Sequence, residues 1–156
     1  MCFWVLYLRV TMCMVEGRAL RGHYNHYPYN FQHFNLNHLL LLVNGKQIPT
    51  QAFKPDFTAQ RFIDDYDSLY DAFGRYGADF ALSFSRDDYR QGYAIWVFDL
   101  TPGNCSSGCI TPRVEGNVRL ELQLAAATTE TVQIILCAEY DSSIEIDKFR
   151  NVLFHL

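Results

Sequence analysis

Apolar and polar residues alternate with a period of two along much of the chain, which predicts a protein built mainly from β-strands. The alternation is strictest over Val118–Leu124, and it returns over Val132–Tyr140. Tyr93–Leu100, which follows a charged turn at Ser85–Tyr89, is almost wholly apolar, as expected for a central strand buried on both faces. Further strands are expected over Phe3–Met12, Phe31–Val43, Lys46–Ile48 and Phe80–Phe84, with Ile144–Phe154 as a last short strand or a tail.

Two features interrupt this pattern. Asn44-Gly45 predicts a tight hairpin, because both residues accept the positive φ angles that a two-residue turn requires. We expect Pro49 and Pro55 to keep the returning strand short. Over about residues 58–75, apolar residues instead recur at steps of three and four, which predicts a single amphipathic α-helix.

The polar face of that helix carries Asp64, Asp65, Asp67 and Asp71. A group of carboxylates could serve as an acidic catalytic or calcium-binding cluster. Asp64, Asp67 and Asp71 share one helical face, opposite the apolar one. We therefore interpret the group as a solvated face rather than as a site.

Together these elements predict an all-β protein in which two antiparallel sheets pack face to face, with one helix inserted. The 156 residues, of which 49% are apolar and 15% aromatic, suffice for one domain with its own core. A parallel α/β sheet would need a helix after nearly every strand, and the pattern offers one.

Charge and cysteine content narrow the function classes. The net charge of −4 argues against a general nucleic-acid binder, which usually carries a basic excess. Five cysteines at irregular spacing do not indicate a secreted disulfide framework, so we expect a reduced, intracellular protein. The apolar start of the chain is too short to span a membrane and lacks a signal peptide's basic segment. Cys105 and Cys109 could hold zinc, but no second pair follows them.

The histidines offer little chemistry. A metal site built from His23, His26, His33 and His38 would be expected to show a His-x-His pair with a nearby glutamate. Residues 23–38 contain neither a His-x-His pair nor a glutamate. No nucleophile motif or phosphate-binding glycine loop stands out. We therefore expect a protein that is not an enzyme, with no catalytic residue, no cofactor and no metal.

Aromatic residues gather between residues 24 and 34, where they could stack on bases or sugars or pack on a neighbouring subunit. The second face of Val132–Tyr140 also carries apolar residues, which suggests that it is partly covered. We expect these two places to contact a neighbouring subunit or domain. The predicted contact residues are Tyr24, Tyr27, Tyr29, Phe31, Phe34, Ile135 and Cys137.

Six blocks of sequence carry a resemblance to a known family. The blocks are Tyr29–Asn37, Val43–Pro49, Phe53–Phe57, Gly92–Pro102, Gly116–Leu122 and Ala138–Val152. In this order they resemble the C-terminal part of a capsid-like protein of Maverick/Polinton elements, which are large virus-like DNA transposons of animal genomes. The similarity runs from about residue 14 to 156, and residues 1–13 form an unmatched apolar segment.

The resemblance implies a major capsid protein of the double-jelly-roll lineage, in which two jelly-roll sandwiches stand side by side and three chains form a capsomer. Residues 14–156 would be the second jelly-roll, and we expect the chain to be a fragment or a genomic copy. Its partners would be copies of itself, as a homotrimer and capsid lattice, and the missing first jelly-roll. It would reside in virions or virus-like particles in the nucleus or cytoplasm, without specific nucleic-acid binding, membrane attachment or secretion.

Two other classes remain open. A cellular β-sandwich module that binds carbohydrate or peptide would be a monomer with a concave aromatic site. A cupin-type enzyme would bind a metal ion.

Overall fold

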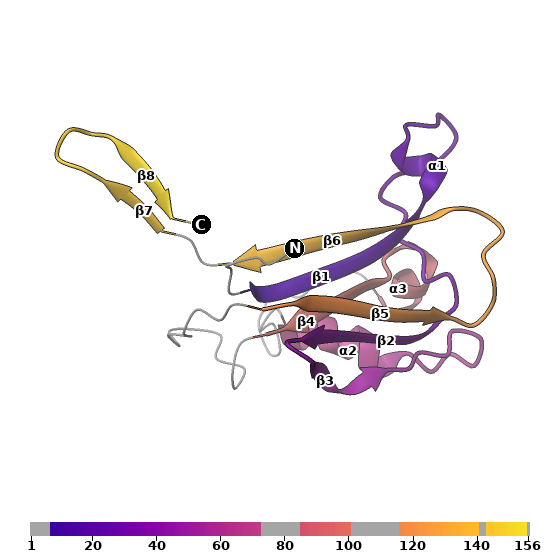
Figure 1. Ribbon diagram of the computed structural model, residues 1–156. Coiled ribbons are helices and arrows are strands. Elements are labelled where there is room, and N and C mark those ends of the chain that lie inside the picture. The colour runs from indigo at the N-terminus through magenta and orange to yellow at the C-terminus, as the bar shows by residue number, and fades with distance from the viewer. Residues whose placement is uncertain (1–6, 73–84, 101–115, 141–142, 156) are drawn as a thin grey trace.

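The computed structural model describes residues 7–72, 85–100, 116–140 and 143–155. Within them, two three-stranded antiparallel sheets share one hydrophobic core, and a two-stranded hairpin projects from one end (Figure 1). The prediction of a mainly β protein with two antiparallel sheets is therefore confirmed.

The first sheet has the strand order β4-β1-β6. Its central strand, β1, spans Tyr7–Glu16 and pairs with β4 (Ile95–Asp99) and β6 (Val132–Tyr140). Residues 7–13, which match nothing in the family resemblance, thus lie in the middle of this sheet.

β4 is shorter than the strand predicted over Tyr93–Leu100. Its centre is buried on both faces as expected, at Trp96, Val97 and Phe98, whereas Tyr93 lies before the strand and is 50% exposed. Among the described strands β4 pairs with β1 alone. The second neighbour predicted for it, Phe80–Phe84, lies outside the described residues. Its burial comes from the core beneath it, where Phe98 contacts the ring of Phe53.

The second sheet has the order β3-β2-β5, with β2 (Leu36–Val43) between β3 (Lys46–Phe53) and β5 (Val118–Leu124). The hairpin at Asn44-Gly45 is confirmed, with φ angles of 53° and 78°. The prediction of a short returning strand is wrong, because β3 continues past Pro49. β3 is an edge strand, where proline is tolerated, and the pairing skips from Ile48 to Phe53.

The predicted helix begins later than expected. α2 spans Ile63–Ala72, because Asp56 first closes a tight loop by accepting the Ala59 N–H at 2.9 Å and pairing with Arg61 at 3.0 Å. The end predicted at residue 75 lies outside the described residues.

The structure contains two further short helices. α1 (Gly17–Leu20) follows β1, and α3 (Arg86–Gly92) replaces the predicted charged turn. Ser85 and Asp88 form a capping box, in which each side chain accepts the other residue's backbone N–H. This local arrangement explains why a charged stretch becomes helical.

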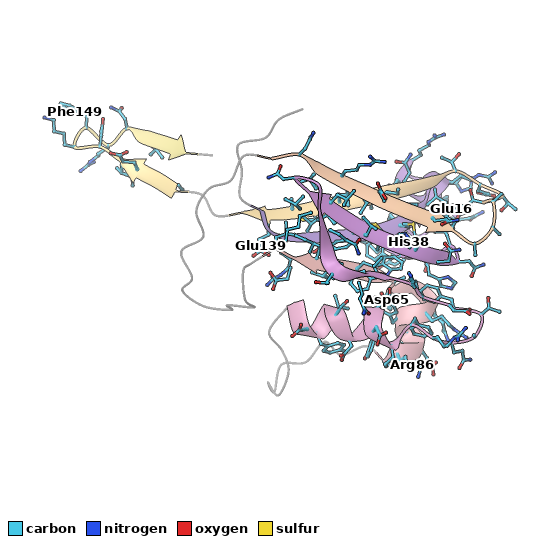
Figure 2. All side chains as sticks on the ribbon, turned by 60° about the horizontal axis from the view of Figure 1, so that its bottom comes forward. Glu16, His38, Asp65, Arg86, Glu139 and Phe149 are labelled. Atoms are coloured by element: carbon cyan, nitrogen blue, oxygen red, sulfur yellow. The ribbon has the colours of Figure 1, made fainter. Side chains whose placement is uncertain are left out.

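Asp65 corrects the interpretation of the acidic face of α2. Its side chain points into the molecule toward the sheets (Figure 2), and the residue is only 2% exposed. The indole Nε1–H of Trp96 donates a hydrogen bond to Asp65 Oδ1 at 2.9 Å. The helix is therefore fixed to β4 by a buried polar contact.

The C-terminal segment is a hairpin rather than a tail. β7 (Ser143–Ile146) pairs with β8 (Val152–His155), and Asp147 accepts the backbone N–H groups of Phe149 and Asn151 in the connecting turn. Figure 2 shows Phe149 at the tip, far from the sandwich. None of the helices in the described residues is long and apolar enough to cross a membrane.

Candidate interaction surface

The tyrosines singled out in the sequence form the most exposed aromatic group of the described residues. Tyr24 is 100% exposed, Tyr27 67% and Tyr29 64%. They lie on the loop that follows α1, here called the tyrosine loop (residues 21–30). The rings of Tyr27 and Tyr29 meet edge to face at 5.6 Å. A group of exposed aromatic side chains is typical of an interaction surface.

Phe31 and Phe34 belong to the body rather than to this surface. The backbone of Phe31 bridges to Tyr93, with its N–H donating to the Gly92 carbonyl at 2.8 Å. Phe34 packs against the core, so both rings are partly buried. They anchor the end of the tyrosine loop.

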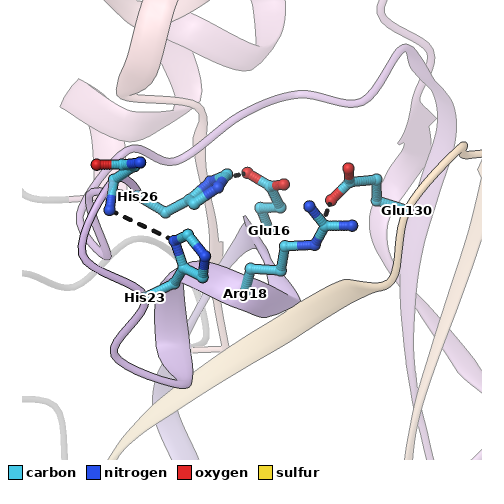
Figure 3. Close-up of polar contacts among 6 residues, drawn as sticks. Glu16, Arg18, His23, His26 and Glu130 are labelled. Carbon is cyan, nitrogen blue, oxygen red and sulfur yellow. Dashed lines mark hydrogen bonds and ion pairs between the residues drawn. The ribbon is translucent and has the colours of Figure 1, made fainter.

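Polar contacts hold the tyrosine loop and the helix before it against the first sheet (Figure 3). His26 Nδ1 lies 2.7 Å from Glu16 Oε2, at the end of β1. The Gly17 N–H donates to the Thr131 carbonyl at 2.8 Å, so α1 is held against the start of β6. The exposed tyrosines therefore project from a loop that is attached to the first sheet.

Glu16 and Glu130 form an interacting pair of carboxyl groups beneath this loop. The interaction between the two side chains lowers the pKa of Glu16 and raises the pKa of Glu130. Arg18 Nε lies 3.4 Å from Glu130 Oε2 (Figure 3), an ion-pair distance without the alignment of a hydrogen bond. The arrangement places acidic, basic and imidazole groups at one end of the sheet.

Two open hollows adjoin the pair. One, of about 580 Å³, is lined by Arg18, Arg21 and the Thr128–Thr131 segment. The other, of about 390 Å³, lies between Gln32, Phe34 and the β5–β6 connection. Sequence reasoning missed Glu16 and Glu130, since they are far apart in the chain and come together only when β1 pairs with β6.

Ile135 and Cys137 lie further along β6. Ile135 pairs with Cys13 of β1 and is half-buried, whereas Cys137 is exposed. Burial and the neighbouring Cys137 raise the pKa of the Cys13 thiol to about 11. The two predicted contact residues are thus on the sheet, apart from the tyrosine loop.

The other face of β6 differs from the alternation predicted for it. Ile134 and Leu136, expected in the core, are 43% and 52% exposed. They pair with the fully buried Met14 and Met12 of β1. Among the strands, β1, β2 and β4 supply buried residues to the core cluster and β6 supplies none, so β6 lies at the margin of the core.

The histidines are spread over separate environments. His33 stacks on Phe57 at 3.9 Å, and burial lowers its pKa, while His23 meets His26 edge to face. Within the described residues, no three His, Cys, Asp or Glu side chains gather as a metal-binding group. Cys105 and Cys109 lie outside the described residues.

Comparisons with known proteins give one curated relative. An uncharacterized protein of Caenorhabditis elegans is 24% identical over 146 residues, which cover 92% of this chain. The chain spans about 35% of the length of that relative. No model of a known protein family matches the chain, and no solved structure matches it significantly.

Proposed function

We propose that this chain is a structural, self-assembling subunit of the viral-capsid type. In this proposal it is a jelly-roll sandwich that forms homotrimers and a capsid lattice, next to a first jelly-roll, inside particles in the nucleus or cytoplasm. The family resemblance suggests this role, and the observation that carries it in the structure is the tyrosine loop, whose three exposed rings project from a fixed position.

The order of strand pairing supports the jelly-roll part of the proposal. β1 pairs with the distant β6, and β2 pairs with the distant β5. A jelly roll forms when a long antiparallel ribbon is rolled up, so that outer strands of the series pair with each other and inner strands pair between them. The pairing of β1 with β6 and of β2 with β5 has this nested order. β3 and β4 would be the next pair in this series. They lie in different sheets and contact each other through the Phe53 and Phe98 rings rather than by backbone pairing.

Sedimentation and electron microscopy test the assembly. The chain joined to the sequence upstream of it in its gene should form trimers or particles, and Tyr27→Ser with Tyr29→Ser should weaken them. Ile63→Ser, which changes an exposed apolar residue on α2, is the matched control and should leave assembly unchanged. A stable monomer of the extended protein at high concentration would contradict the proposal.

A ligand-binding β-sandwich is the second candidate, favoured by the two hollows beside the tyrosine loop. Tyrosine rings and a nearby carboxylate pair are groups that bind sugars or basic peptides. Glycan and peptide arrays probed with the purified chain would detect this activity. Binding that disappears in Tyr27→Ser and Glu16→Gln, in a chain that forms neither trimers nor particles, would favour this candidate over the first.

A further inference from the structure

β6 has one backbone edge without a partner strand in the described part of the chain, because it lies at the end of the order β4-β1-β6. The strand is nine residues long. Residues 133–138 carry no charge and no proline, and Ile134 and Leu136 are about half exposed. A long apolar edge strand without charged residues or proline readily pairs with another strand.

The edges of the second sheet differ from this edge. β5 carries Arg119 and Glu121, which form a 3.0 Å ion pair at the surface. β3 carries Lys46 and Pro49. Charges and prolines on edge strands discourage pairing with a second molecule. β6 is therefore more open to association than either edge of the second sheet, and with nine residues it is longer than β4, the five-residue strand at the other edge of its own sheet.

The sequence of β6 is also complementary to itself. In an antiparallel pairing of two copies centred on Leu136, Ile134 faces Ala138 of the second copy and Ile135 faces its Cys137. Glu139 faces Gln133, so no like charges are opposed. A second copy of this chain thus fits the edge without burying an unpaired charge.

We propose that two copies of this chain associate through antiparallel edge-to-edge pairing of their β6 strands, which joins their first sheets into one continuous sheet. The pairing is two-fold, with the same surface on both copies. It does not depend on the capsid-type function, since a ligand-binding sandwich could form the same dimer.

The arrangement also brings together two exposed apolar surfaces that a single copy keeps apart. The tyrosine loop adjoins the start of β6, where Glu16 pairs with Val132, and the β7–β8 hairpin follows its end (Figure 1). Antiparallel pairing places Tyr140 opposite Val132 of the second copy. The exposed face of the hairpin, with Ile144 and Ile146, is thereby carried toward the second copy's tyrosine loop.

Sedimentation of the complete chain over a range of concentrations tests the dimer. Leu136→Lys would place two ammonium groups opposite each other at the centre, and we expect it to raise the dimer Kd about tenfold or more. Val118→Lys introduces the same charge at an exposed apolar position on β5 and should leave the Kd unchanged. An equal effect of both variants, or a wild-type chain that stays monomeric, would overturn the proposal.

Cross-linking tests the register even if the lysine variant folds poorly. Directly opposed residues of paired strands have Cα atoms about 4.5–5.5 Å apart, a distance that a disulfide can bridge. Leu136→Cys in a Cys137→Ser background should therefore give disulfide-linked dimers on mild oxidation. Val118→Cys in the same background should not, and comparable cross-linking of both variants would indicate random collision and refute the pairing.

Discussion

Asp65 is a carboxyl group enclosed in the core between α2 and β4. Burial raises its pKa from the usual 3.8 to about 6, and the hydrogen bond from Trp96 only partly opposes this rise. The folded state therefore favours the protonated carboxyl more than the unfolded state does. Its contribution to stability is fully present below pH 4 and is lost as the pH rises through 6.

Asp65→Asn should stabilise the protein at neutral pH. The amide oxygen of asparagine can still accept the Trp96 indole hydrogen bond, but it carries no charge to desolvate. The rise of the Asp65 pKa from 3.8 to about 6 corresponds to about 3 kcal/mol, so the gain at pH 7.5 should approach this size and vanish near pH 4. Urea unfolding of both proteins at the two pH values measures the difference, and an equal difference at both would contradict the assignment.

Trp96 is the other half of this contact and is fully buried. Trp96→Ala should lower the free energy of unfolding by about 3–5 kcal/mol, because it leaves a cavity. Trp96→Phe retains most of the apolar volume but removes the donor to Asp65, at a cost of about 1–3 kcal/mol. Adding Asp65→Asn to Trp96→Phe should restore part of that loss, whereas additive effects would show that the two residues do not interact.

At the scale of elements, features set by neighbouring residues were predictable and features set by distant ones were not. Asn44-Gly45 and the alternation over Val118–Leu124 determine a turn and a strand locally. The burial of Asp65 depends on Trp96, which is 31 residues away in the chain. The exposure of Ile134 and Leu136 depends on which strand lies at the edge of the sheet, and period-two alternation does not specify this.

α3 is determined by neighbouring residues, yet its sequence lacks the apolar periodicity that predicts a helix. The helix is seven residues long, and its capping box consists of Ser85 and Asp88. Ser85→Ala should cost about 1 kcal/mol, because the Asp88 N–H loses its partner. Gln91→Ala, at an exposed position of the same helix, is the control and should change stability far less. Equal midpoints of urea unfolding for the two variants would argue against the cap.

At the scale of the molecule, the described residues form a sandwich with a buried core, from which the tyrosine loop and the β7–β8 hairpin project. Period-two patterning predicted the two sheets because each sheet has a buried face. The aromatic residues noted near residue 24 include three exposed tyrosines, and their contact with a neighbouring subunit stays a prediction. The pattern did not indicate the Glu16–Glu130 pair, or that β6 has one edge without a partner among the described strands, because both arise from the order of strands in space.

The hairpin provides a test that separates folding from association. β7 and β8 pair with each other and project from the sandwich (Figure 1), so Ile144→Ser with Ile146→Ser should leave the thermal midpoint of the sandwich within about 2 °C of the wild type. The same variant should weaken the dimer, because those side chains would lose apolar contact with the second copy. Far-ultraviolet circular dichroism gives the midpoint, and sedimentation gives the Kd. A midpoint lowered by several degrees would mean that the hairpin packs on its own sandwich, and its face would then not be available to a second copy.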